Sequence, residues 1–218
     1  MAVSNSVSAI NIVSYNMHGF NQGYPLIENL INSVKPGVFL LQEHWLTPAN
    51  INQFDRFPNY FSFGSSAMSK STELGMLYGR PFGGVMTVIS DQLRSVTETI
   101  YSEERLVIVR ISSFLLVNVY LPCIGTDNRL SICEDMFSVI EYWCDQYINC
   151  KILLAGVLNV NLDCHGDPVS SVILNFAAKR CLLRCDDLFP SQKTDTYVNE
   201  ALRCSNHIEL YSRHAATI

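Results

Sequence analysis

Residues 38–43, Val-Phe-Leu-Leu-Gln-Glu, form a short apolar run that ends in two polar side chains. A continuous run of this length is typical of a strand buried on both faces of a sheet. Upstream, Ile10–Tyr15 alternates apolar and polar residues and predicts another strand, followed by a loop over Asn16–Tyr24. Pro25 opens an apolar stripe at helical spacing, which Pro36-Gly37 ends. Strand, helix and strand in this order predict a parallel βαβ unit.

The rest of the chain follows a different pattern. Consecutive strands without intervening helices favour antiparallel pairing, and they are expected at 60–63, 84–90, 105–111 and 115–121. The glycine-rich segment 65–83 is expected to be a long loop. The remaining patterns predict helices over 129–147 and 169–178, a buried strand over 152–155, and late strands at 196–198 and 208–210. Two sheets flanked by helices account for this order of elements.

The composition limits the class of protein. The chain has 218 residues, of which 48% are hydrophobic and only 16% are charged. A chain of this size buries a large core within one domain, and its low charge excludes an intrinsically disordered protein. Its apolar runs are far shorter than the roughly 18 residues of a membrane span. We therefore expect one globular domain and no membrane partner.

Charge and cysteine usage narrow the expected partners. A net charge of −5 disfavours a long basic footprint on nucleic acid. Contact with a phosphate backbone is then expected to be local or made through a metal ion. The eight cysteines all lie in the C-terminal half without a Cys-x-x-Cys, which argues against a zinc site. The first residues lack the features of a signal peptide, so we expect reduced thiols and an intracellular protein.

Several polar residues stand directly after the expected buried strands, where ligand sites form in open α/β sheets. They are Asn16, Glu43, Tyr120 and Asn159. A carboxylate at a strand tip, with amides and a phenol nearby, suits a hard cation such as Mg²⁺. Each residue also has a structural interpretation, because a strand-end asparagine commonly caps a turn, a lone glutamate is commonly solvated, and Tyr120 fits a half-buried core position.

Five short motifs occur in a fixed order along the chain: Ser14-Tyr-Asn16-Met-His-Gly19, Leu41-Gln-Glu43, Gly83-Gly84-Val85, Asn118-Val-Tyr120-Leu-Pro122 and Gly156-Val-Leu-Asn159. Together they resemble the endonuclease/exonuclease/phosphatase superfamily. Two further stretches, Gln42-Glu-His-Trp-Leu46 and Thr196-Tyr-Val-Asn-Glu-Ala201, resemble the endonuclease domains of non-LTR (LINE-type) retrotransposons. The resemblance covers residues 10–212, nearly the whole chain.

The resemblance implies an α+β fold: a four-layer α/β/β/α sandwich of two mixed sheets, as in deoxyribonuclease. It also implies cleavage of a phosphodiester with Mg²⁺ or Mn²⁺. By position, Glu43 would be the metal carboxylate and Asn16 would hold the hydrogen bonds of the metal site. Tyr120 would contact the scissile phosphate, and Asn159 would orient the residue that positions the attacking water. His18 and His44 flank these residues and are candidates for contact with the substrate phosphate.

The sequence departs from the family pattern in two places. Val157 stands where the motif Gly-Asp-x-Asn has its aspartate, and a valine cannot act as a general base. Asp163 and Asp167 lie downstream, but a substitute would have to reach the same water. Near the C-terminus, Glu209 replaces the family aspartate, which makes it the second candidate carboxylate, and no later Ser-Asp-His follows. We therefore expect a single domain over 1–218 that lacks its last strand, with His165, His207 and His214 as exposed polar residues.

Three hypotheses follow. The chain is a divalent-metal endonuclease that nicks DNA; or it is a non-catalytic remnant that at most binds nucleic acid; or it acts on a phospholipid or inositol phosphate, which the motif at 196–201 disfavours. The missing catalytic groups predict that the family function is DNA cleavage and that this chain is severely impaired, since such residues act as a unit. We expect DNA as partner, a monomer without an obligate protein partner, and a nuclear location if the chain works as a retroelement endonuclease.

Overall fold

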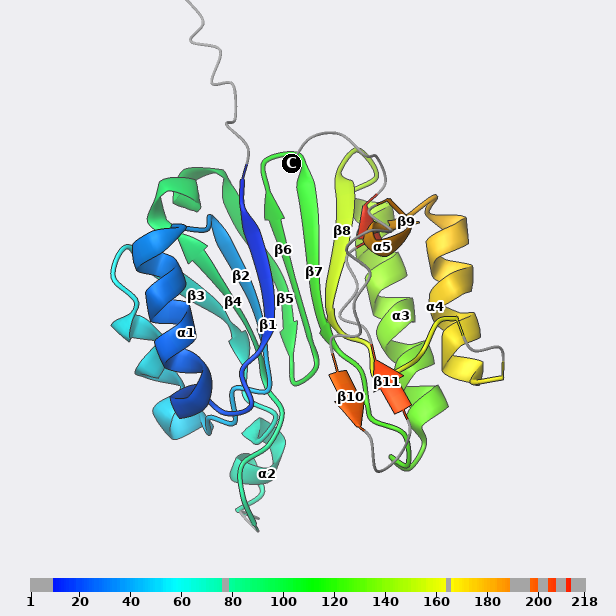
Figure 1. Ribbon diagram of the computed structural model, residues 1–218, viewed down its shortest axis with the longest axis horizontal. Coiled ribbons are helices and arrows are strands. Elements are labelled where there is room, and N and C mark those ends of the chain that lie inside the picture. Colours follow the sequence, from blue (N-terminus) through cyan, green and yellow to red (C-terminus); the bar gives the residue numbers. More distant parts are fainter. Residues whose placement is uncertain are drawn as a thin grey trace, which may run out of the picture.

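The computed structural model describes residues 10–75, 79–163, 166–188, 197–199, 204–206 and 211–212. Within these ranges two β-sheets pack face to face, and the longer helices cover their outer surfaces (Figure 1). Helix α1 (Phe20–Ser33) lies against the first sheet, whereas α3 (Arg129–Gln146) and α4 (Pro168–Lys179) lie against the second. The α+β sandwich of two mixed sheets flanked by helices, expected from the sequence, is confirmed.

The first sheet has the strand order β1-β2-β4-β3. Its strands are β1 (Ile12–Asn16), β2 (Val38–Gln42), β3 (Tyr60–Ser65) and β4 (Val85–Ser90). Strands β1 and β2 are parallel, with Ile12 opposite Val38 and Asn16 opposite Gln42, as the βαβ pattern predicts. Strand β4 pairs antiparallel with both β2 and β3. The carboxyl ends of β1 and β2 therefore meet at one edge of this sheet.

The second sheet has the order β5-β6-β7-β8-β12-β9 in the described residues. Its strands are β5 (Thr97–Glu103), β6 (Leu106–Ile111), β7 (Phe114–Tyr120), β8 (Lys151–Val157), β9 (Leu183–Arg184) and β12 (Tyr211–Ser212). Strands β5, β6 and β7 are antiparallel, and β7 runs parallel to β8. The expected absence of a last strand stays a prediction, because it concerns the end of the chain, where only residues 211–212 are described.

Smaller elements complete the described ranges. They are the 3₁₀ helices η1 (Pro48–Arg56) and η2 (Asp91–Val96), the short helices α2 (Ser69–Glu73) and α5 (Cys185–Leu188), and the antiparallel strands β10 (Tyr197–Asn199) and β11 (Cys204–Asn206). None of the helices in the described ranges is long and apolar enough to cross a membrane.

Helix α1 begins at Phe20, five residues before the start that the sequence pattern indicates. The prediction took Pro25 as the first helical turn, but Pro25 lies inside the helix. The earlier turn is held by backbone bonds, in which the Gly19 and Phe20 amides donate to the carbonyls of Glu43 and His44, each at 2.8 Å. Phe20 is also buried, with its ring centroid 5.1 Å from that of Phe54. Tertiary contacts thus outweigh the single hydrogen bond that a proline removes.

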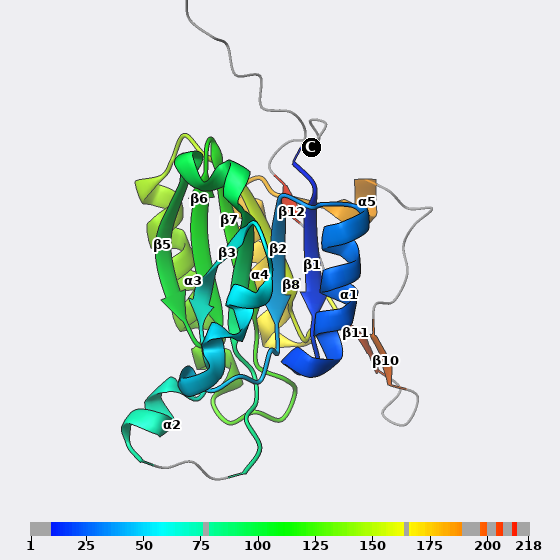
Figure 2. The ribbon, with the colours of Figure 1, turned by 90° about the vertical axis from the view of Figure 1, so that its left-hand side faces the viewer.

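Segment 65–83 contains regular structure that the expected long loop did not include, whereas its residues 79–83 are loop as expected. Strand β3 continues to Ser65, and the buried residues Ser66–Met68 anchor helix α2. The Ser66 hydroxyl donates to the Leu46 carbonyl and accepts a bond from the Met68 amide at 3.0 Å. Figure 2 shows that α2 extends beyond the body of the sandwich, past the ends of β1 and β2.

The interior contains three apolar layers. Alternate residues of β2 divide between two of them: Phe39 and Leu41 face α1, whereas Val38 and Leu40 face the second sheet. This double burial explains the continuous apolar run of β2. The third layer packs β7 and β8 against α3 and α4, with Phe137 on α3 and Phe176 on α4 at a centroid distance of 5.1 Å.

A group of buried polar contacts crosses the inner layer between the sheets at Asn118. Gln42 on β2 and Asn118 on β7 are both fully buried, and Gln42 Nε2 donates to Asn118 Oδ1 at 2.7 Å. Asn118 Nδ2 donates in turn to the Met86 carbonyl at 3.1 Å. The two sheets are therefore joined by directional bonds beside Glu43 and Tyr120.

Replacing Asn118 tests this bridge. Asn118→Ala removes one acceptor of the Gln42 amide and the donor to the Met86 carbonyl inside the core, and unsatisfied buried polar groups cost about 1–3 kcal/mol each. We expect the free energy of unfolding in urea to fall by about 2–4 kcal/mol. The matched control is Asn175→Ala on the exposed face of α4, which should change stability by less than about 0.5 kcal/mol. Equal effects of the two variants would contradict a structural role for the bridge.

Candidate active site

Glu43 and Asn16 lie side by side at the carboxyl ends of β2 and β1. Asn16 is the last residue of β1, and Glu43 follows the last residue of β2. The Asn16 amide Nδ2 donates to Glu43 Oε1 at 2.8 Å. Glu43 adopts a φ of 54°, in the left-handed region that non-glycine residues rarely enter. Parallel pairing thus brings the predicted metal carboxylate and its predicted hydrogen-bond partner together.

His18 forms the solvent-facing side of this pair. Its backbone amide donates to Asn16 Oδ1 at 3.1 Å, and its ring Nδ1 lies 3.8 Å from Glu43 Oε2. The His18 side chain is 56% exposed, whereas that of Glu43 is 16% exposed. His18 therefore stands where an approaching anion could meet its ring.

Tyr120 is the last residue of β7 and lies on the second sheet. Burial, together with the nearby Glu43 carboxylate, raises the pKa of the Tyr120 phenol well above its ordinary value. The Arg105 guanidinium lies over the Tyr120 ring at 5.3 Å from its centroid. The phenol therefore keeps its proton at neutral pH and can donate a hydrogen bond beside Glu43.

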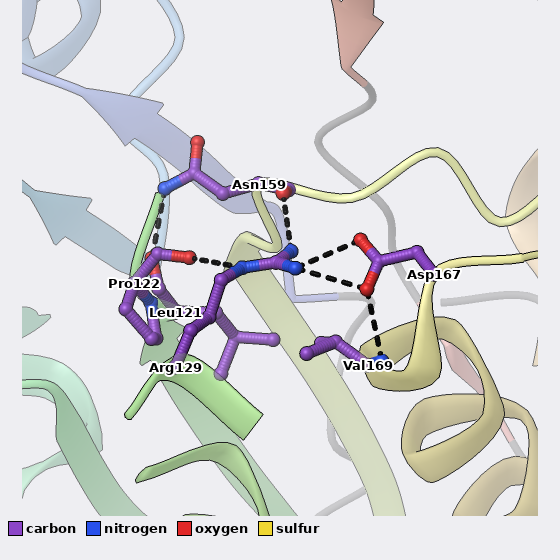
Figure 3. A network of polar contacts seen from close by, with 6 residues as sticks. All are labelled: Leu121, Pro122, Arg129, Asn159, Asp167 and Val169. Atoms are coloured by element: carbon purple, nitrogen blue, oxygen red, sulfur yellow. Dashed lines mark hydrogen bonds and ion pairs between the residues drawn. The ribbon is translucent and has the colours of Figure 1, made fainter. Parts of the chain in front are cut away.

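Asn159 is held at the end of β8 by a network that Figure 3 shows. Its amide Nδ2 donates to the Leu121 carbonyl at 2.7 Å, and its own carbonyl accepts from Arg129 Nη2 at 2.9 Å. Asn159 has a φ of 51°, again in the left-handed region. The side-chain oxygen of Asn159 points away from Arg129 (Figure 3). The network therefore orients this oxygen without forming a hydrogen bond to it.

Arg129 is the centre of this network and joins three segments. Its Nη1 donates to both oxygens of Asp167, at 2.9 and 2.8 Å, and its Nε donates to the Pro122 carbonyl at 3.0 Å. Asp167 Oδ1 also accepts from the Val169 amide at 3.0 Å and so caps α4. Sequence reasoning missed Arg129. The available signal was a cation in the first turn of a helix, where it is unfavourable without an acidic partner.

Val157 occupies the position at which the resemblance implies an aspartate. It ends β8 opposite Tyr120, two residues after Ala155, whose side chain packs between the sheets. Asp167 is bound to Arg129, and Asp163 lies 2.7 Å from Arg184 Nη1. Neither downstream aspartate is therefore a ready replacement for the missing carboxylate.

His44 does not lie where a phosphate could reach it. Its ring is fully buried, its Nδ1 accepts from the Leu46 amide at 3.0 Å, and its Nε2 lies 3.1 Å from the Ser65 carbonyl. Burial lowers the pKa of His44 to about 4. The ring is thus neutral at pH 7, with Nε2 carrying the proton. The expected phosphate contact at His44 is replaced by a structural role, in which the ring ties the segment after Glu43 to β3.

Several sequence-predicted residues fall outside the described ranges. Glu209, the second candidate carboxylate, is one of them, and His165, His207 and His214 are others. Ser205 is described only as part of the backbone of β11.

The donor set fits a hard cation with an open coordination sphere. Across the described ranges, no group of three or more His, Cys, Asp or Glu side chains could enclose a metal ion. Glu43 instead offers a single carboxylate, with the Asn16 amide beside it. Mg²⁺ keeps several waters and commonly takes only one or two carboxylates together with substrate phosphates. The pair Glu43 and Asn16 therefore suits Mg²⁺ or Mn²⁺ and does not suit a closed zinc site.

Solved structures of known proteins share the fold of this chain. No protein-family model and no curated protein matches the chain. Among solved structures, the chain is similar to a variant of the 3′ phosphatase NExo from Neisseria bound to product DNA hairpin, with a TM-score of 0.67, 16% identity, and coverage of 94% of this chain and 86% of that one. It is similar to the AP endonuclease LMAP from Leishmania major, with a TM-score of 0.70, 13% identity, and coverage of 93% and 78%.

The human Nocturnin catalytic domain with bound sulfate anion is also similar, with a TM-score of 0.63, 12% identity, and coverage of 94% of this chain and 82% of that one. The chain therefore has the fold of the endonuclease/exonuclease/phosphatase proteins, the deoxyribonuclease-like sandwich.

Arg129→Lys tests the network that holds Asn159. A lysine cannot make the forked contact with Asp167 and also bond the carbonyls of Pro122 and Asn159. We expect the free energy of unfolding in urea to fall by about 2 kcal/mol. Arg94→Lys is the matched control, because Arg94 pairs with Asp91 on the exposed surface; its effect should stay below about 0.5 kcal/mol. A loss at Arg129 no larger than that at Arg94 would contradict the role given to the network.

Proposed function

We propose that this chain is a metal-dependent phosphodiesterase of the endonuclease/exonuclease/phosphatase type that acts on DNA, and that its nicking activity is severely impaired. The observation that carries the proposal is the hydrogen-bonded pair Asn16 and Glu43 beside Tyr120, with Val157 at the neighbouring strand end. Carboxylate, amide and phenol are the groups that such a reaction needs, whereas the residue that would activate water is missing. We also propose a retrotransposon origin, which is supported by the sequence motifs at 42–46 and 196–201.

Each residue has a distinct proposed role. Glu43, with Asn16 beside it, would hold Mg²⁺ or Mn²⁺, which when bound would polarise the phosphoryl oxygen and offset developing negative charge. The Tyr120 phenol donates a hydrogen bond to the scissile phosphate. His18 contacts a phosphate oxygen from the exposed side of Glu43. Asn159 would orient a water-positioning group at residue 157, but the side chain of Val157 cannot position a water.

Glu209 completes the proposed set as the second carboxylate, in place of the family aspartate. A glutamate is longer by one C–C bond, and a displacement of about 1 Å in a catalytic group can cost about 10²-fold in rate. Together with Val157, this substitution favours a strongly reduced rate. We further propose that the chain works as a monomer, inside the cell and in the nucleus if it serves a retroelement.

The second candidate function is a non-catalytic remnant that at most binds nucleic acid. Val157 is the observation that favours it, because general-base catalysis typically contributes about 10²–10⁴-fold. The two candidates differ in what restoring the carboxylate does. In an impaired enzyme a carboxylate at residue 157 returns activity, whereas in a remnant it does not.

The test is Mg²⁺-dependent nicking of supercoiled plasmid by the purified 218-residue chain. Val157→Asp should raise the nicking rate by at least about 10²-fold over the unaltered chain. Adding Glu43→Ala to Val157→Asp should abolish the gain, because the metal carboxylate is lost. Val96→Asp is the matched control, since this exposed valine lies away from the site and its replacement should leave nicking unchanged.

Two outcomes would contradict the proposal. Robust nicking by the unaltered chain, abolished by Glu43→Ala, would refute the impairment. A Val157→Asp variant that folds but stays inactive would favour the remnant and place the main defect elsewhere.

A further inference from the structure

Trp45 is an exposed aromatic residue held rigidly next to the proposed site. It lies two residues after Glu43, adopts a φ of 55°, and is 37% exposed. Its backbone amide donates to the Gly83 carbonyl at 3.0 Å. Part of the indole is therefore open to solvent, whereas the rest of the residue packs against the protein. Here the backbone is fixed in a rare conformation while the ring stays accessible.

Contacts on both sides link Trp45 to the proposed site. On one side its ring lies so close to Gly19 that a Cβ at this glycine would be 2.7 Å from Trp45 Cε3. The residue before Gly19 is His18, whose ring reaches toward Glu43. On the other side Gly83, which bonds the Trp45 amide, faces Tyr120, since a Cβ at Gly83 would lie 3.8 Å from Tyr120 Cε1. Trp45 therefore contacts Gly19, which adjoins His18, and bonds to Gly83, which lies close to Tyr120.

Phe82 supplies a second exposed ring in the same region. It precedes Gly83 and is 54% exposed. Because Gly83 is bonded to Trp45, the two aromatic residues stand on adjacent segments at the edge of the proposed site. Two accessible rings beside a phosphodiester site are the arrangement that proteins use to stack unpaired nucleobases.

We propose that Trp45, assisted by Phe82, binds an unpaired base of the nucleic-acid substrate by stacking, next to the phosphate held at Glu43 and Tyr120. This inference rests on the proposed function and names its substrate class: a strand whose bases are unpaired at the cleavage site. A base inside a duplex has its faces covered by its neighbours, so only an unstacked base offers a face to an indole. The chain carries a net charge of −5, so attraction to the phosphate backbone contributes little and contacts with the bases would have to supply more of the affinity.

The two tryptophans of the chain make a direct measurement possible. Trp143 on α3 packs against the rings of Tyr101, Tyr142 and Tyr147. Trp143→Phe therefore leaves Trp45 as the single indole. Titration of this variant with single-stranded octathymidylate should quench Trp45 emission in a saturable manner. An abasic oligomer of the same length offers the phosphates without the bases and should quench little.

The affinity for a labelled octathymidylate, measured in Ca²⁺ or EDTA so that no cleavage occurs, distinguishes the contributions of Trp45 and Phe82 to binding. Trp45→Ala should weaken binding about 10-fold, Phe82→Ala should weaken it by a smaller factor, and Trp45→Phe should keep most of the affinity. Tyr142→Ala is the matched control, because this ring is 55% exposed on α3 and should not matter. Circular dichroism and thermal unfolding show which variants are folded, and Trp45→Phe keeps the test valid if Trp45→Ala does not fold.

The outcomes distinguish this inference from the proposed function. Any one of three results overturns the stacking inference alone. They are unchanged affinity in folded Trp45→Ala and Phe82→Ala, equal affinity for the abasic oligomer, and tighter binding of a blunt hairpin duplex. Base-dependent binding that needs Trp45, together with an inactive Val157→Asp variant, supports stacking while the catalytic proposal fails. If no oligonucleotide binds to the unaltered chain, both are overturned.

Discussion

The hydrogen bond from Gln42 to Asn118 is the contact on which the arrangement of this molecule depends most. The candidate site is assembled from strand ends of two different sheets, Glu43 after β2 and Tyr120 at the end of β7. Apolar packing between the sheets is strong but has no direction, so it leaves their relative register poorly defined. The Gln42 amide bonds Asn118 at 2.7 Å, one residue before Glu43 and two before Tyr120. Because both partners are fully buried, a register that separated them would leave polar groups unsatisfied.

Around that bridge the strand ends adopt uncommon conformations. His18, Glu43, Trp45 and Asn159 all have positive φ, and such residues persist only where the surrounding structure enforces them. The enforcement is visible: backbone bonds tie Gly19 and Phe20 to the segment after Glu43, the neutral His44 ring ties it to β3, and Arg129 fixes Asn159. The described part of the candidate site is therefore an ordered scaffold, with Val157 at the position where the resemblance implies an aspartate.

Much of this was readable from the sequence, and the exceptions have physical causes. The apolar runs of β2 and β8 and the helical stripe of α3 predicted their elements, since each is set by local periodicity. Strand β5 was missed because it lies at a sheet edge and is half exposed, so its residues carry little apolar alternation. The start of α1 at Phe20 and the structural role of His44 depend on contacts with residues distant in sequence, which no local pattern encodes. Asn16 and Glu43 could be placed together because parallel strands end at the same edge, whereas the bonding of Asp167 to Arg129 required the tertiary structure.

The central claim is that a divalent cation binds at the single carboxylate of Glu43, although no cluster of three or more His, Cys, Asp or Glu side chains surrounds it in the described ranges. The most direct test is paramagnetic broadening of backbone amide resonances by a substoichiometric amount of Mn²⁺. The account predicts that the amide signals of Asn16, His18 and Glu43 broaden first, that those of α3 and α4 stay sharp, and that Glu43→Ala removes the effect. Broadening centred on another acidic region, such as Glu103 and Glu104, or broadening unchanged by Glu43→Ala, would contradict it.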